Sequence, residues 1–213
     1  TEAMLPQTRK ALFWDIVHLH WQTLLTLGLV LLLFALPLVL STLARDIYIP
    51  RLVRAAESAA ADVPQDGLQT VLLYFELGRS IVNILFLMLL AVGLSGVLRI
   101  LRQYAWLENV HAPTDFARGL RDNCKQLLAL ALLGGLVCTL CLLVLSFSTA
   151  YRSGLTASIS LIPIGVSLLL GLPVLAIAVV MIPVYSNTVA AHLKNAFYVY
   201  THAPFRVLLA LLC

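Results

Sequence analysis

The sequence predicts an all-α membrane protein, a polytopic transmembrane helix bundle. Of its 213 residues, 61% are hydrophobic and only 11% are charged, against about 25% charged residues in ordinary soluble domains. A soluble domain of this length cannot bury so much apolar surface, so lipid must solvate much of it. Because backbone polar groups in lipid have to be hydrogen-bonded within the segment itself, long apolar runs cross only as helices.

Five apolar runs define the elements of a single transmembrane helical domain, residues 1–213. A spanning helix needs about 20 apolar residues, and four of the runs reach this length. The predicted complete spans cover about residues 21–43, 71–98, 127–147 and 155–184. The fifth run, 205–213, starts a span but is too short to cross, so we expect the natural chain to continue.

The segment before the first span is predicted to be an interfacial amphipathic helix, residues 5–20. Its apolar side chains recur at helical spacing, with two tryptophans beside them: Leu12, Phe13, Ile16, Val17, Trp14 and Trp21. Tryptophan rings favour the depth of the lipid headgroups. We therefore expect this helix to lie on the membrane surface.

Three connections carry helix signals of their own. Pro50 is expected to open a short separate helix. Pro113 starts a helix that runs on into the third span, with Arg118 and Asp122 spaced to form an i,i+4 pair. A further amphipathic helix is predicted before Pro204. Its apolar stripe comprises Val189, Leu193, Phe197 and Tyr200.

The basic residues favour a cytosolic N-terminus, because Lys and Arg collect on the cytosolic side of membrane proteins. One side receives nine of them, namely Arg9, Lys10, Arg99, Arg102, Arg118, Arg121, Lys125, Lys194 and Arg206. The other side receives Arg45, Arg51, Arg54 and Arg152, with Arg79 near the edge of the second span. The net charge of +4 comes without a polybasic run, so we expect the lipid bilayer and no nucleic acid as a partner.

Three intramembrane polar residues share one face of the second span. Glu76, Arg79 and Asn83 stand at i, i+3 and i+7. A charge in hydrocarbon is costly and usually functional. However, a helix of 28 residues is about 42 Å long and exceeds the ~30 Å hydrocarbon core. An ion pair at the interface and a polar site inside the bundle therefore both stay open.

The fourth span contains three prolines, Pro163, Pro173 and Pro183. Proline removes a helix hydrogen bond, and broken helices line many transporter sites. Proline is also common in ordinary membrane helices. A kinked packing helix and a broken, substrate-lining helix are the two interpretations.

Residues for catalysis, metal or cofactor binding form no recognisable pattern. The five histidines all fall on the predicted cytosolic side: His18, His20, His111, His192 and His202. With Asp15 and Asp115 they could form a metal site, but no ligand spacing such as HExxH occurs. Cys138 and Cys141 lie in an apolar run, where packing is the expected role. We expect no cofactor, no metal and no enzymatic activity, with a histidine-based membrane enzyme as the least favoured alternative.

Two segments of the predicted cytosolic side carry longer patterns. Residues 115–126 read D-F-A-R-G-L-R-D-N-C-K-Q, and residues 194–209 contain K-N-A followed by H-A-P-F-R-V-L-L. These segments resemble the D-F-x-x-G-x-x-x-N-x-K-Q and K-N-A … H-x-P-x-R-x-L-L patterns of the YesL-like family of small bacterial membrane proteins. The resemblance covers about residues 83–213. It departs from the family at residues 92–96, which read V-G-L-S-G where the family usually has a proline-containing motif.

The resemblance implies a bacterial cell membrane and frequent association with carbohydrate-uptake systems, without an assigned reaction. We therefore expect an accessory or interaction component whose helices 116–126 and 189–200 dock a transport-system protein. The predicted partner-binding residues are Asp115, Phe116, Arg118, Arg121, Lys125, Lys194, Asn195, His202 and Arg206. The alternative is a small transporter or channel component that uses the fourth span and the polar face of the second. Glycines such as Gly134 and Gly135 would let helices approach closely, so a homo-oligomer also stays open.

Overall fold

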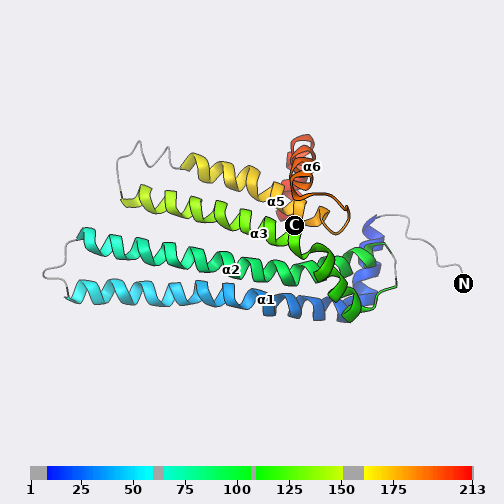
Figure 1. The fold of residues 1–213 in the computed structure, drawn as a ribbon, viewed down its shortest axis with the longest axis horizontal. Coiled ribbons are helices and arrows are strands. Elements are labelled where there is room, and N and C mark those ends of the chain that lie inside the picture. The colour runs from blue at the N-terminus through cyan, green and yellow to red at the C-terminus, as the bar shows by residue number, and fades with distance from the viewer. Residues whose placement is uncertain (1–8, 60–64, 107–108, 151–160, 213) are drawn as a thin grey trace, which may run out of the picture.

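The computed structural model describes residues 9–59, 65–106, 109–150 and 161–212, and the regular structure of these residues is helical. The labelled elements are α1 (Arg9–Ala59), α2 (Gln65–Ala105), α3 (Ala112–Ala150), a π-helical turn η1 (Ser167–Gly171), α5 (Leu172–Met181), α6 (Val189–His202) and α7 (Pro204–Leu212). Residues 161–166 are helical and lead directly into η1. Figure 1 shows α1, α2 and α3 side by side, with α6 lying across one end of the bundle.

Within the described residues, four helices are long and apolar enough to cross a membrane, and the all-α class predicted from the sequence is confirmed. They cover Trp14–Ala55, Thr70–Ala105, Ala112–Leu145 and Leu161–Met181. The first three helices are longer than the predicted spans. α2 has 41 residues and is therefore about 60 Å long, roughly twice the thickness of the hydrocarbon core. The part of the fourth predicted span before Leu161 lies outside the described residues.

α1 bends at one residue and passes straight through two prolines. The backbone of His20 is not helical (φ −120°, ψ 20°), and the segment before it turns away from the long axis of the bundle (Figure 1). This bend lies at the predicted end of the 5–20 helix, of which residues 5–8 lie outside the described part of the chain. The prediction that Pro50 opens a separate helix is wrong, because α1 continues through Pro37 and Pro50 to Ala59. Pro50 is exposed near the helix end, where solvent can bond the carbonyl that it leaves without a partner.

α2 and α3 approach each other closely at two glycines, Gly96 and Gly119. A Cβ atom added to Gly119 would lie 2.7 Å from the Ser95 carbonyl oxygen and 2.9 Å from Gly96 Cα. A Cβ atom added to Gly96 would overlap the Phe116 ring. Small residues let membrane helices pack backbone against backbone in this way. This contact fixes the position of α3 against the C-terminal third of α2.

The buried core lies toward the same end of the bundle. One group joins α2, α3, α5 and α6 and comprises Ala91, Leu127, Leu130, Val174, Ala178, Ile182, Ala196 and Tyr200. A second group joins α1 and α2 through Leu27, Val97, Ile100 and Tyr104. Many large apolar side chains outside these groups are exposed, as expected of helices that lipid surrounds.

Replacement of Gly119 by alanine should destabilise the fold. The added methyl group has to displace α3 from α2, and overpacking of this kind costs about 1–3 kcal/mol. Gly78→Ala is the matched control, because a Cβ atom there meets nothing within 4 Å and alanine favours the helix by up to about 1 kcal/mol. Thermal unfolding in detergent, followed by circular dichroism, measures both variants. Equal unfolding temperatures for Gly119→Ala and Gly78→Ala would contradict the packing described above.

Candidate functional site

Three charged side chains form a cluster between α1 and α2, here named the Glu76 cluster: Arg45, Glu76 and Arg79. Arg45 Nε donates a hydrogen bond to Glu76 Oε1 at 2.6 Å, and Arg79 donates from Nε and Nη2 to Oε2 at 2.9 and 2.7 Å. Each carboxylate oxygen is therefore bound by a different guanidinium group. The sequence places Glu76 and Arg79 on one face, but it does not reveal that α1 supplies Arg45.

Asn83, the third predicted polar residue of this face, also bonds to α1. Its Oδ1 accepts a hydrogen bond from Ser41 Oγ at 2.6 Å. Ser41 stands four residues before Arg45, so the two polar contacts follow each other along α1 and α2. The predicted polar residues thus link two helices and do not converge on a common point.

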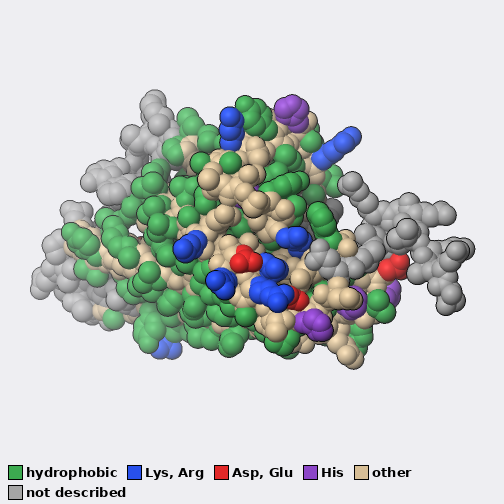
Figure 2. All heavy atoms as spheres, turned by 45° about the vertical axis from the view of Figure 1, so that its right-hand side comes forward, with side chains coloured by type: hydrophobic (Ala, Val, Ile, Leu, Met, Phe, Trp, Pro, Cys, Tyr) green, Lys and Arg blue, Asp and Glu red, His purple; other side chains and the backbone are tan. Residues whose placement is uncertain are grey.

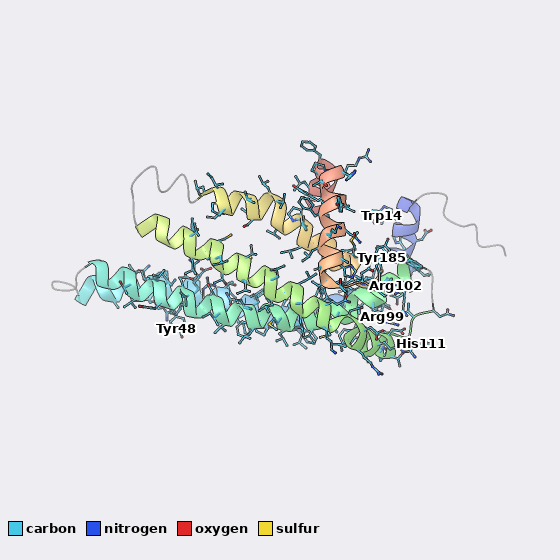
Figure 3. All side chains as sticks on the ribbon, turned by 45° about the horizontal axis from the view of Figure 1, so that its top comes forward. Trp14, Tyr48, Arg99, Arg102, His111 and Tyr185 are labelled. Atoms are coloured by element: carbon cyan, nitrogen blue, oxygen red, sulfur yellow. The ribbon has the colours of Figure 1, made fainter. Side chains whose placement is uncertain are left out.

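A second charged group, the Arg99 cluster, lies at the other end of the bundle and comprises Arg99, Arg102 and Asp122. Arg99 Nη1 of α2 pairs with Asp122 Oδ2 of α3. Arg102 Nη1 donates to the Pro183 carbonyl oxygen at 2.9 Å, and its guanidinium lies 5.4 Å from the centre of the Trp106 ring. Figure 3 shows Arg99 and Arg102 at the same end as Trp14 and Tyr185, whereas Tyr48 lies toward the opposite end.

The pairing of Asp122 corrects a prediction from the sequence. Arg118 and Asp122 are spaced as an i,i+4 pair, but Arg118 instead lies 3.6 Å from Asp115. Asp122 faces α2 and forms an ion pair with Arg99. An ion pair between helices offers a partly buried partner, with Arg99 23% exposed, whereas an exposed pair within one helix contributes only tenths of a kcal/mol.

The start of α3 is held by Asp115. Its Oδ2 accepts a hydrogen bond from the His111 backbone N–H at 2.8 Å, and Thr114 Oγ1 donates to the His111 carbonyl at 3.0 Å. Asp115 is only 3% exposed, and Phe116 packs on Gly96. The D-F-x-x-G residues that carry the family resemblance are therefore internal packing residues in this structure. Asp115 is buried and Phe116 is half-buried, so Asp115 offers almost no surface to a partner.

The other members of the predicted partner-binding set are exposed. They are Arg118, Arg121 and Lys125 on α3, Lys194, Asn195 and His202 on α6, and Arg206 on α7. Gln126 Nε2 of α3 donates to the Asn187 carbonyl oxygen at 2.8 Å, directly before α6. This bond brings the two sequence segments together. Figure 2 shows the Lys and Arg side chains that gather around a few acidic ones on this end of the molecule.

α6 packs on the core with most of the predicted stripe, because Tyr200 is buried and Val189 and Leu193 pack against the core residues. Its buried residues are His192, Ala196 and Tyr200, whereas Phe197 is 43% exposed. His192 is fully buried, and within the described part of the chain neither of its ring nitrogens has a hydrogen-bond partner. The sequence offers no signal for this burial. Within the described residues no three His, Cys, Asp or Glu side chains are placed to hold a metal ion.

The proline break of the fourth span is closed by Tyr200. Helix 161–181 contains a π-helical turn, η1, directly before Pro173. Pro173 has no N–H to give to the Leu169 carbonyl four residues earlier. Tyr200 Oη donates a hydrogen bond to that carbonyl oxygen. Orphaned carbonyls in membrane helices are commonly satisfied by a neighbouring helix, and this contact favours the kinked packing helix over an open break.

Comparison of the chain with protein-family models, with curated proteins and with solved structures finds no match. The resemblance to YesL-like proteins therefore rests on the residue patterns alone.

Replacement of Tyr200 by phenylalanine should loosen α6 from the fourth span. The change leaves the Leu169 carbonyl without its donor, and the loss of one such hydrogen bond costs about 0.5–1.5 kcal/mol. Tyr198→Phe is the control, because Tyr198 lies on the same helix and is 53% exposed. Thermal unfolding in detergent should show a lower midpoint for Tyr200→Phe and an unchanged one for Tyr198→Phe. Identical midpoints for the two variants would argue against the role assigned to Tyr200.

Proposed function

We propose that this protein is a non-enzymatic accessory component that docks a partner on the basic end of its helix bundle. The observation that carries the proposal is the hydrogen bond between Gln126 and the Asn187 carbonyl, which joins the N-terminal half of α3 to the residues directly before α6. The two predicted docking segments thereby form one continuous surface. Its inward-facing residues hold the fold together, and its outward-facing residues are mostly basic or polar.

The docking surface is defined by Arg118, Arg121 and Lys125 of α3 together with Lys194 and Asn195 of α6. Within the described residues, Arg121, Lys125 and Lys194 make no ion pair, and Arg118 is 68% exposed beside the buried Asp115. Unpaired cations on a surface favour an acidic partner and speed its association. An acidic surface of a transport-system protein would complement these residues, and the link to transport is supported by the family resemblance.

We assign the basic end to the cytosol of a bacterial cell. Basic residues collect on the cytosolic side of membrane proteins, and this end contains most of the basic residues of the chain. Exposed aromatic residues support a membrane boundary here, because Trp14, Trp106 and Tyr185 are each more than half exposed. Tyr48 and Tyr74, which are 62% and 70% exposed, occupy the opposite boundary. Aromatic rings of this kind are enriched at both membrane–water interfaces.

The alternative of a small transporter for a polar substrate has less support. A polar permeant needs polar groups along its path, whereas α2 has no charged residue between Arg79 and Arg99. The proline break of the fourth span, which could have supplied backbone groups, is occupied by Tyr200.

Site-directed photo-crosslinking in native membranes tests the proposed docking. A photoreactive residue at Arg121 should capture one predominant protein, identified by mass spectrometry. The same residue at Arg51, an exposed position at the opposite end, should not capture it. The capture should also disappear when Arg118 and Lys125 are both changed to glutamate, because the acidic partner is then repelled. Capture of the same protein from both ends, or capture that survives the charge reversal, would reject the docking surface.

A further inference from the structure

The cations of the docking surface on α3 lie close to one level of the bundle. The ion pair between Arg99 and Asp122 joins α2 to α3 and defines this level. On α3, Arg118 stands four residues before Asp122, and Lys125 stands three residues after it. A helix rises about 1.5 Å per residue, so the backbones of these two cations are about 6 Å and about 4.5 Å from the level of the ion pair. Arg121 lies between them.

The start of α6 belongs to the same layer. Gln126, four residues after Asp122, donates a hydrogen bond to the Asn187 carbonyl oxygen. The residues directly before α6 are therefore within about 6 Å of the ion-pair level. From there α6 runs across the end of the bundle (Figure 1). Lys194 and Asn195 of the docking surface thus stay close to the level of the α3 cations.

This level has the position expected of one boundary of the hydrocarbon core. Arg79 and Arg99 are 20 residues apart on α2, with no charged residue between them. Their separation of about 30 Å matches the thickness of the core. Lipid headgroups extend about 5–7 Å beyond the core on each side. The docking surface therefore falls at headgroup depth, and a partner has to displace lipid in order to reach it.

The face of α3 that carries the three cations continues as an exposed apolar stripe. From Lys125 it passes, at spacings of three or four residues, through the α3 stripe, which comprises Ala129, Leu132, Leu136 and Leu140. The three leucines are 43%, 46% and 61% exposed. The core residue Leu127 lies on the opposite side of the helix. The cations and the α3 stripe therefore form one continuous outward face.

The two parts of this face complement each other in binding. Lipid tails solvate leucine side chains as well as another helix does, so the α3 stripe alone gives little driving force for association. Cations at headgroup depth attract acidic groups more strongly than cations in water do, because the effective dielectric constant is lower there. The acidic groups have to lie at the same depth. A transmembrane helix with acidic residues at its end meets both requirements.

We propose that the docking surface receives an integral membrane protein, an inference that rests on the docking function proposed above. One transmembrane helix of the partner packs along the α3 stripe. Acidic residues at the end of that helix pair with Arg118, Arg121 and Lys125. The partner is thereby narrowed from any acidic protein to one that spans the bilayer beside α3.

Photo-crosslinking from the middle of the α3 stripe tests this proposal in native membranes. Leu132 stands ten residues after Asp122, and Leu89 stands ten residues before Arg99 on the neighbouring helix α2. The two leucines therefore lie at similar depth, and they are 43% and 40% exposed. A photoreactive residue at Leu132 should capture the same protein as one at Arg121. The same residue at Leu89, the matched control, should not capture it.

The charged part of the face is tested in the same experiment. Changing Arg118 and Lys125 to glutamate should abolish capture from Leu132, because repulsion at headgroup depth removes the partner from the α3 stripe. Extraction of native membranes with alkaline carbonate, which releases proteins held only at the membrane surface, should leave the partner in the membrane. This second measurement needs no variant in the stripe.

The outcomes separate this proposal from the docking function itself. Capture of a protein from Arg121, with only lipid captured from Leu132, would overturn the transmembrane partner and leave the docking surface in place. Release of the partner by carbonate would do the same. Equal capture from Leu132 and Leu89, or capture from Leu132 that survives the charge reversal, would also overturn the proposal. The absence of a predominant protein at Arg121 would reject the docking function and this inference with it.

Discussion

The position of the protein in the bilayer follows from the cost of placing charge in hydrocarbon. Arg79 and Arg99 are 20 residues apart on α2, with no charged residue between them. At 1.5 Å per residue they are separated by about 30 Å, which is the thickness of the hydrocarbon core. α1 and α3 obey the same limits, because Arg45 pairs with Glu76 at one boundary and Asp122 with Arg99 at the other. The two charged clusters are therefore ties between helices, and their separation matches the thickness of a hydrocarbon core.

This constraint explains how the remaining elements are arranged. Beside the Arg99 cluster, α2 and α3 pack backbone against backbone through Gly96 and Gly119. At the Arg99 end, water and lipid headgroups allow polar groups again, so Arg102 can bind the Pro183 carbonyl and Gln126 the Asn187 carbonyl. These bonds place α6 across the end of the bundle. At the other end, α1 and α2 continue beyond the Glu76 cluster, because the thickness of the hydrocarbon core sets no limit on how far a helix extends outside it.

The sequence was sufficient to predict the class of fold, because apolar runs of spanning length have only one stable form in lipid. It was also sufficient for the bend at His20, the long helix from Ala112 and the break at Pro204. It failed at Pro50, where α1 continues although proline often starts a helix. A local pattern cannot show that the exposed position of Pro50 makes the lost hydrogen bond inexpensive.

The contacts between helices were the part that the sequence could not provide. Spacing placed Glu76 and Arg79 on one face of α2. Their partner Arg45 lies on α1, 31 residues before Glu76 in the sequence. Spacing also suggested a pair between Arg118 and Asp122, whereas in the folded bundle Asp122 forms an ion pair with Arg99. The Asp115–Phe116 motif looked like a surface signal, and its residues are in fact the inner side of the α2–α3 contact. His192 gave no sign of its burial, because that depends on how α6 meets the fourth span.

The placement of the bilayer between the two clusters is tested most directly by cysteine accessibility along α2. Three side chains are similarly exposed at the protein surface: Tyr74 at 70%, Leu85 at 61% and Trp106 at 61%. A difference in how fast cysteines label at these positions would therefore come from the surrounding lipid. Each would be changed to cysteine in a variant without the four native cysteines and treated with a water-soluble maleimide in open membrane fragments. Labelling at positions 74 and 106, with labelling at 85 only after detergent denaturation, is the result that this placement predicts. Equally rapid labelling at position 85 in intact bilayers would contradict it.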